Sequence, residues 1–341
     1  MVVAPTAQRL SLQCEGIAAD TTTIRSLDWE RSRFDIEFGL RNGTTYNSFL
    51  VRGERTALID SSHAKFRDSW IPLLKDQIDP SAIDVLIVSH TEPDHSGLIG
   101  DLIDLNPEIE IVGSKVAIQF LQDQVHRPFR SRAVKSGEEL DLGTNPDSGV
   151  QHRFEFLSAP NLHWPDTIFS FDHGTGTLYT CDAFGLHYCS EELFDSDPGA
   201  IAPDFRFYYD CLMGPNARSV LQALKRMDSL PEINTVAVGH GPLLRHHLSH
   251  WLNDYREWSG QRSKGESYAA VCYLSQYGFS DRISQAIAHG IGKADAQVQL
   301  VDLRATDPQE LTALVGEAKA VVVPTWPEEP DADVQAAIGT L

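Results

Sequence analysis

Short apolar runs alternate with amphipathic stretches along most of the chain. Between about residues 34 and 238 the runs are rich in β-branched side chains and end at Gly, Pro, Asp or Asn, which is typical of strands bounded by turns. They read YNSFLV, TALID, VLIVS, IEIVG, FEFLS, LYTC and TVAVG. Between them, apolar residues recur with helical spacing over 65–77, 115–124 and 216–227. Strands and helices are therefore mixed through one domain of the α+β or α/β class.

A polar stretch at 258–266, WSGQRSKGE, interrupts this pattern and predicts a linker. The residues after it predict a strand at 268–274, a loop SQYGFSD, a helix at 282–290 and strands at 298–301 and 320–323. That order opens a doubly wound parallel sheet. The 341 residues are enough for two domains. We expect the first domain to cover 1–262 and the second 263–341.

The charge balance excludes two classes of partner. With 48 acidic and 28 basic side chains, the formal net charge of -20 repels nucleic acid and anionic membrane surfaces. No apolar run is long enough to span a bilayer, and the first residues, MVVAPTAQRL, lack the pattern of a secretory signal. The five scattered cysteines form no CxxC pair and indicate a reducing compartment. The sequence thus predicts a cytoplasmic protein without a membrane span.

Metal-binding side chains are concentrated in the segment LIVSHTEPDHSG. His90, Glu92, Asp94 and His95 lie within six residues, directly after a predicted buried strand. The alternative interpretation is a solvated polar turn before a helix that begins near Ser96. Such a dense set of ligand types at the end of a rigid strand favours a metal site.

Three further candidate ligands follow other predicted strands in the same way. They are His163 in APNLHWPD, Asp182 in CDAFG and His240 in GHGP. A lone loop histidine is more often structural, but these residues share a position at strand ends, beside the proline and glycines that shape the loops. The recurrence predicts one site built from distant loops.

From about residue 34 to 250 this pattern resembles the metallo-β-lactamase superfamily, in which two packed sheets hold two metals. The resemblance implies an α+β fold, an αββα sandwich, followed by a truncated flavodoxin-like α/β segment. Glu92 stands where the zinc hydrolases of the superfamily usually have a histidine. A carboxylate hardens the site and favours iron over zinc. The phrases NGTTYNSFLV, SHTEPDHSG, NLHWPDT, CDAFG, YDCLMGPNARSV and GHGPLLRH are similar to those of flavodiiron proteins, particularly the photosynthetic, cyanobacterial group with all iron ligands retained.

The flavodiiron resemblance implies two iron ions and a reaction. His90, Glu92 and His163 would bind the iron nearer the flavin, while Asp94, His95 and His240 would bind the other. Asp182 would bridge the two ions, and Tyr209 would lie near the substrate pocket. Two adjacent ferrous ions can pass electrons to dioxygen, which is reduced to water; some members reduce nitric oxide to nitrous oxide instead.

The flavodiiron resemblance also implies a flavin cofactor. In full-length relatives FMN relays the electrons, and the residues here that match its site are Ser275, Tyr277, Gly278, Ser280, Thr325 and Trp326. The segment 263–341 is shorter than a complete domain of this kind, so weak or absent FMN binding is expected. Electrons would then come from an external donor, and the chain would form a homodimer or a hetero-oligomer with a paralogue.

Two other functions stay open at this stage. A dinuclear zinc hydrolase of thioesters or lactones is compatible with the superfamily fold, although Glu92 disfavours it. A non-catalytic module that only pairs with another chain is disfavoured by the intact ligand set.

Overall fold

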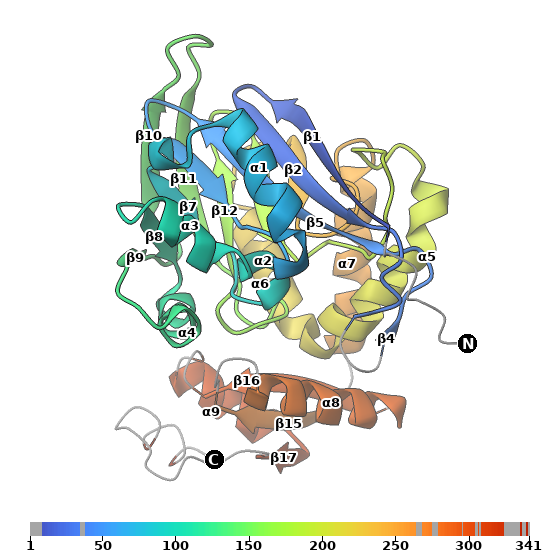
Figure 1. Cartoon of the computed structure of the whole chain (residues 1–341). Helices are drawn as coiled ribbons and strands as arrows, with labels where there is room; N and C mark the ends of the chain where they lie inside the picture. The colour runs from blue at the N-terminus through green and yellow to red at the C-terminus, as the bar shows by residue number, and fades with distance from the viewer. Residues whose placement is uncertain are drawn as a thin grey trace, which may run out of the picture.

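Two β-sheets packed face to face form the larger part of the molecule (Figure 1). The computed structural model describes residues 9–34, 38–263, 268–274, 279–294, 296–303, 306, 308–323, 335 and 339. The strands of the first sheet, in spatial order, are β1 (Leu10–Ala18), β2 (Thr21–Asp28), β5 (Thr44–Arg52), β6 (Thr56–Ile59), β7 (Val85–Ile87), β8 (Glu110–Gly113) and β9 (Arg130–Ala133). The pairs β1–β2, β2–β5 and β5–β6 are antiparallel, and β6 to β9 run parallel.

The second sheet is mainly antiparallel. Its strands, in order, are β10 (Glu139–Thr144), β11 (Gln151–Ser158), β12 (Ile168–Asp172), β13 (Thr177–Cys181) and β14 (Thr235–Val238). The last pair, β13 and β14, is parallel. A separate short ribbon pairs β3 (Arg33–Phe34) with β4 (Phe38–Gly39).

Helices cover both outer faces of the sandwich. On the first sheet lie α1 (Arg67–Gln77), α3 (Ile99–Leu105) and α4 (Lys115–Val125), and on the second α6 (Ala217–Met227) and α7 (Leu248–Ser263) (Figure 1). The remaining short helices are α2 (Pro93–Ser96), α5 (Pro198–Tyr208), a π-helix (Tyr209–Met213) and 3-10 turns at Ala64–Phe66, Pro80–Ala82 and Gly214–Asn216. One apolar core fills the space between the sheets and continues under α6 and α7, while a second lies beneath α1, α3 and α4. Burial of these apolar side chains is the main term that stabilises the sandwich.

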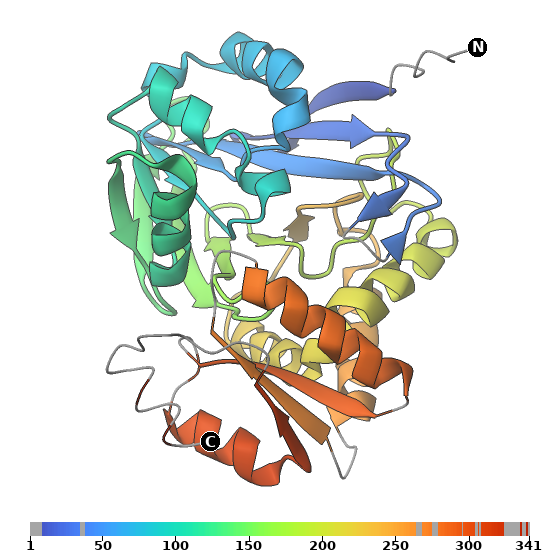
Figure 2. The ribbon, with the colours of Figure 1, turned by 60° about the horizontal axis from the view of Figure 1, so that its bottom comes forward.

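A third, parallel sheet follows in the C-terminal part of the chain. Its order is β16 (Gln297–Asp302), β15 (Tyr268–Tyr273) and β17 (Ala320–Val322). The helices α8 (Phe279–Lys293) and α9 (Pro308–Glu317) pack on its opposite faces, because alternate residues of β15 enter different apolar clusters. Figure 2 shows α8 on the side of this sheet that faces the sandwich. The predicted fold class, an αββα sandwich followed by an α/β segment, is confirmed.

One local prediction, the linker at 258–266, is wrong for its first six residues, because α7 continues to Ser263. Side-chain contacts hold these last turns in place: Ser259 Oγ lies 2.9 Å from the Tyr209 hydroxyl, and Arg262 forms an ion pair with Asp210 at 2.6 Å. Gly260 faces open space. It lowers the intrinsic helix propensity of this segment, but the helix does not end there. Within the described residues, no helix is both long and apolar enough to cross a membrane.

Candidate metal centre

The predicted ligands leave their strands at one edge of the sandwich. In the first sheet β6 and β7 are parallel with Ile59 opposite Ile87, and the segment with His90 to His95 follows β7. In the second sheet β13 and β14 are parallel with Cys181 opposite Val238. Because parallel neighbours end at the same edge, the residues that follow them emerge side by side. Asp182 and His240 are thereby brought together although 58 positions separate them in the chain.

Buried carboxylates shape the segment that follows β7. Asp60 accepts a hydrogen bond from the backbone N–H of Ser89 at 2.8 Å. Asp166 accepts from both the backbone N–H and the hydroxyl of Thr91, at 2.8 and 2.7 Å. These bonds fix the backbone on both sides of His90, so its imidazole does not have to be ordered when a ligand binds.

The second half of the motif is helical. The Glu92 carbonyl accepts from the backbone N–H groups of His95 at 3.0 Å and Ser96 at 2.9 Å, which closes the single turn of α2. The turn begins at Pro93, whose fixed φ suits a first helical position. The sequence placed the start of a helix near Ser96; instead Asp94 and His95 themselves lie in a helical turn.

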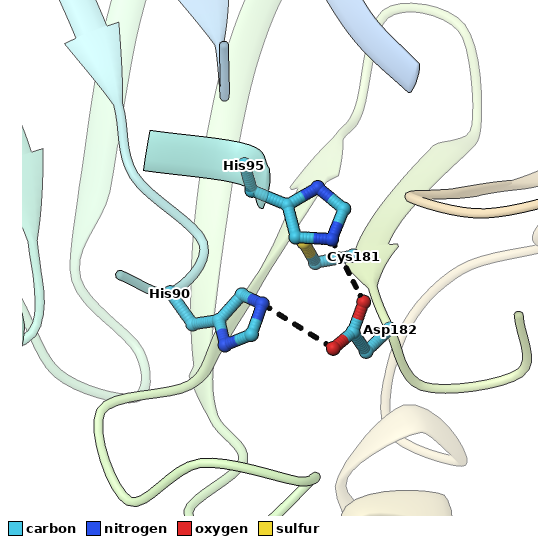
Figure 3. A group of neighbouring side chains, drawn as sticks. All are labelled: His90, His95, Cys181 and Asp182. Atoms are coloured by element: carbon cyan, nitrogen blue, oxygen red, sulfur yellow. Dashed lines mark hydrogen bonds and ion pairs between the residues drawn. The ribbon is translucent and has the colours of Figure 1, made fainter. Parts of the chain in front are cut away.

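Asp182 lies at the centre of the cluster and divides its two carboxylate oxygens between two pairs of imidazoles. Its Oδ2 is 3.3 Å from His90 Nε2 and 3.0 Å from His163 Nε2. Its Oδ1 is 3.0 Å from His95 Nε2 and 3.2 Å from His240 Nε2. Figure 3 shows His90 and His95 reaching Asp182 from separate directions. This is the arrangement expected of a carboxylate that bridges two cations.

Each imidazole pair has a second carboxylate of its own. Glu92 Oε2 lies 2.9 Å from His163 Nε2. The Asp94 carboxylate lies 3.4 Å from His240 Nε2 and 3.7 Å from His95 Nε2. All seven predicted ligands therefore meet, in the two groups that the sequence predicted, and their role as ligands stays a prediction.

The cluster is chemically incomplete without a cation. The Nε2 atoms of His95 and His240 lie 3.1 Å apart, although both are directed at the same carboxylate oxygen. Neither ring nitrogen of His90 has a hydrogen-bond partner in the described part of the chain, and both are buried. Buried polar atoms normally form hydrogen bonds, so a buried imidazole without a partner fits coordination to a metal ion.

The electrostatics of the cluster also favour bound cations. Burial alone would raise the pKa of Asp182, but the surrounding imidazoles hold it well below the usual carboxyl value. Burial likewise opposes protonation of His240, yet Asp182 and Asp94 raise its pKa to about 10. Burial lowers the pKa of His90 to about 3 despite the attraction of Asp182. The carboxylates thus attract positive charge, and metal ions compete with protons for these sites.

The strand β5 fixes the last ligand. His240 Nδ1 lies 2.6 Å from the Thr45 carbonyl oxygen, and Asn47 donates to the carbonyls of Val238 and Gly241 at 2.9 and 3.0 Å. Gly239 is required for close approach, because a Cβ there would lie 2.7 Å from His95 Cε1. The Nδ1 proton bonded to Thr45 leaves Nε2 free to bind a metal.

Cys181 is a buried residue of a metal-binding type that is not among the seven predicted ligands. One ligand-capable atom from each of His90, His95, Cys181 and Asp182 lies within 4.8 Å of the others (Figure 3). Burial raises the pKa of its thiol well above the usual value, and the nearby carboxylates raise it further. Burial therefore favours the protonated thiol as long as no cation is bound.

A cavity of about 400 Å³ opens onto the cluster. Five of the predicted ligands line it: Glu92, Asp94, His163, Asp182 and His240. Phe34, Phe38 and Leu212 supply apolar wall, and Arg282, Gln285 and Ala286 of α8 line it from the C-terminal unit. A small molecule that enters this cavity reaches the carboxylates directly.

The predicted pocket tyrosine lies elsewhere. The Tyr209 hydroxyl lies 2.9 Å from Ser259 Oγ, and its ring packs on Tyr255 and Trp258, outside the cavity lining. Its neighbour Tyr208 lines the cavity instead, fully buried, and its hydroxyl has no hydrogen-bond partner among the described residues. Tyr208, and not Tyr209, is therefore the tyrosine that lines the cavity.

A histidine that the sequence did not single out also lines the cavity. His187 is buried, its Nδ1 lies 2.8 Å from Thr44 Oγ1, and its ring centroid is 4.6 Å from that of His240. Burial lowers its pKa well below the usual value, so the ring is neutral.

Most of the predicted flavin residues lie outside the described residues: Ser275, Tyr277, Gly278, Thr325 and Trp326. Ser280 is described and buried, and its hydroxyl donates to the Leu274 carbonyl.

Comparison with known proteins identifies the family. The model described as ODP family beta lactamase matches residues 44–241. Over 337 residues the chain is 57% identical to diflavin flavoprotein A 1 of Synechocystis sp., covering 99% of this chain and 58% of that protein. The metal-soaked Flv1 flavodiiron core of Synechocystis sp. PCC6803 superposes with a TM-score of 0.85 at 30% identity, covering 97% of this chain and 82% of that one. The chain belongs to the flavodiiron family.

A second solved relative covers only the sandwich of this flavodiiron chain. It is a fragment, residues 1–254, of diflavin flavoprotein A 5 from Nostoc sp. PCC 7120, with a TM-score of 0.68 and 33% identity over 74% of this chain and 98% of that one. Membership in the flavodiiron family does not favour the zinc hydrolase considered from sequence. The chain spans 58% of the length of the Synechocystis relative.

Proposed function

We propose that this flavodiiron chain binds two iron ions and reduces dioxygen to water. The observation that carries the proposal is the division of the Asp182 carboxylate between His90 and His163 on one side and His95 and His240 on the other. Glu92 and Asp94 add one carboxylate to each side. Oxygen-rich sites with imidazoles and open positions suit ferrous and ferric iron.

When bound, a diferrous pair would supply two of the four electrons that dioxygen needs, and an external donor would supply the other two, so that four protons complete its reduction to two water molecules. The contribution of the protein is geometric. Asp166 and Asp60 hold the segment with His90, and the Thr45 carbonyl orients His240 through its Nδ1–H. The ligands are thus already in place when substrate arrives, which lowers the reorganisation that the reaction needs.

Tyr208 is placed to contact the substrate. Tyr208 lines the cavity and its buried hydroxyl has no hydrogen-bond partner in the described residues, so it is available to donate a hydrogen bond to an oxygen species held there. Phe34, Phe38 and Leu212 give the cavity an apolar wall, which suits a small apolar substrate such as dioxygen.

Metal analysis and gas uptake test this proposal together. Purified protein should contain about two iron ions per chain, and the chemically reduced protein should consume dioxygen, whereas protein stripped by a chelator should not. Zinc in place of iron with esterase activity would instead support a hydrolase, and little metal of any kind would refute a metalloenzyme. The rates at which the same reduced protein consumes nitric oxide and dioxygen show which gas is preferred.

We also propose that the residues from 263 onward form part of a flavodoxin-like domain in which FMN binding is weak. Ser280, the one predicted phosphate contact that is described, already donates its hydroxyl to the Leu274 carbonyl. A flavin titration followed by fluorescence quenching tests this, and submicromolar binding of FMN would contradict it. We further propose that an external donor supplies the electrons. The chain would form a homodimer or a complex with a paralogue.

A further inference from the structure

The helix α8 of the C-terminal unit contacts a predicted iron ligand of its own chain. Gln285 Nε2 lies 3.2 Å from His163 Nδ1, and 122 positions separate the two residues. The other ring nitrogen, His163 Nε2, faces Glu92 and Asp182 at 2.9 and 3.0 Å. The imidazole therefore lies between the metal cluster on one side and α8 on the other.

The four predicted histidine ligands differ in how their outward nitrogens are satisfied. His240 Nδ1 is bonded to the Thr45 carbonyl, within the sandwich. His90 Nδ1 and His95 Nδ1 have no hydrogen-bond partner among the described residues. His163 thus resembles His240 in having a defined outer partner, but that partner comes from the C-terminal unit.

Coordination chemistry decides which atom of Gln285 faces the ring. If His163 Nε2 binds a metal through its lone pair, the ring proton must reside on Nδ1, which then needs an acceptor. The amide oxygen and nitrogen of glutamine exchange places by a half-turn that leaves the rest of the side chain unchanged. The amide oxygen of Gln285 therefore accepts from Nδ1–H once metal is bound.

Independent contacts hold α8 and its sheet against this loop. Tyr273 of β15 donates to Asn161 Oδ1 at 3.2 Å, two residues before His163. Arg218 of α6 binds Glu317 at 3.1 Å. Its guanidinium also stacks 4.4 Å above the ring of Tyr268. Figure 2 shows α8 running along the side of the third sheet nearest the sandwich.

We infer that Gln285 is a positioning residue that orients His163 for metal binding, so that the docked C-terminal unit tunes the affinity of the half-site formed by His90, Glu92 and His163. This inference rests on the proposed diiron centre. The half-site of Asp94, His95 and His240 has its outer contact within the sandwich and does not depend on α8.

Cobalt(II) titration of the metal-free full chain tests the inference, with absorption spectra and calorimetry resolving the two sites. Gln285→Leu removes the acceptor at similar volume and should weaken one of two cobalt sites by about 10- to 100-fold, while the other is unchanged. Gln285→Glu retains an acceptor and should bind as tightly as the parent. Ile283→Ala, an exposed position on the same helix, is the matched control and should change neither site.

Three outcomes are decisive. Equal cobalt affinities in the parent and Gln285→Leu overturn the inference. Equal weakening by Gln285→Leu and Gln285→Glu also overturns it, because the effect would then come from packing and not from the acceptor. If the parent itself binds no cobalt, the proposed diiron centre fails, which is a separate and recognisable result.

Discussion

Asp182 is the residue on which both proposed half-sites depend, because each of its oxygens faces a different imidazole pair. Asp182→Ala should therefore reduce bound iron from about two ions per chain to well under one, since both ions lose a ligand. The matched variant is Asp94→Ala, which removes a carboxylate from one side only and should leave about one ion. Elemental analysis of the purified variants measures this. Iron content in Asp182→Ala that equals the parent's would contradict the bridge.

In the proposed diiron centre Glu92 sets the hardness of its half-site, because it contacts His163 and, unlike Asp182, is not shared with the other half-site. Glu92→His should shift the zinc-to-iron ratio in protein from mixed-metal growth toward zinc, by roughly tenfold if the change is worth about 1.4 kcal/mol. Glu92→Asp is the control, because it keeps the carboxylate and changes only its reach. A metal ratio that is the same in all three proteins would count against the hardness argument.

The convergence of the seven candidate ligands could be predicted from sequence, because each is a ligand type placed just beyond a strand that the hydrophobic pattern indicates. The tyrosine that lines the cavity could not be predicted from sequence. Tyr208 and Tyr209 are adjacent, and α5 passes into a π-helix at that point, so the phase of the helix alone decides which ring faces the cavity. Gln285 left no signal at all, because its contact depends on how two distant units dock.

At the scale of the elements, the sequence recovered those with strong periodicity and missed those without it. The buried strands β5, β7 and β14 and the helices α1, α4 and α6 lie where the pattern placed them. The strand β1 is largely exposed, and exposed and buried residues alternate along most of β10. Neither strand therefore has the apolar run by which the other strands were predicted. The end of α7 was missed because Gly260 and its polar neighbours resemble a linker.

The turn between β1 and β2 is joined to the second sheet by a buried histidine between two carboxylates. His152 Nδ1 lies 2.8 Å from Asp172, and His152 Nε2 lies 3.3 Å from Asp20 in that turn. Burial opposes the charged ring, but the hydrogen bond and charge of Asp172, followed by those of Asp20, raise the pKa of His152 above its usual 6.5. The protonated ring therefore stabilises the fold.

The direction of the pH dependence follows from this raised pKa. The stabilisation by His152 is complete below pH 6.5 and is lost as the pH rises through the higher value in the folded protein. His152→Gln should lower the unfolding free energy by about 1–2 kcal/mol at low pH and by less above that window. Urea unfolding at a series of pH values measures the difference from the parent. His246→Gln, an exposed position, is the control, and a parent-to-variant gap that widens with pH would refute the assignment.

At the scale of the whole molecule, two units with separate cores meet at the metal cavity. The two large apolar clusters draw their residues from the sandwich, and the two small ones from the strands and helices after residue 267. Polar contacts such as Gln285 with His163 and Tyr273 with Asn161 join the units. Separate cores joined by polar contacts are typical of independent domains. The boundary between residues 262 and 263 stays a prediction, and α7 extends one residue beyond it.

This organisation predicts the behaviour of the sandwich alone. A fragment of residues 1–263 should fold, because it retains both large cores and all of α7. A fragment of the Nostoc relative, residues 1–254, which covers 74% of this chain, has a solved structure. The circular dichroism of the 1–263 fragment should show a cooperative thermal transition. It should bind one cobalt ion as tightly as the full chain and the other about 10- to 100-fold more weakly, as in Gln285→Leu, because His163 has lost the same acceptor. Two tight sites in the folded fragment would show that α8 covers the cavity without tuning it, and a fragment that does not fold would place part of the sandwich's stability in the C-terminal unit.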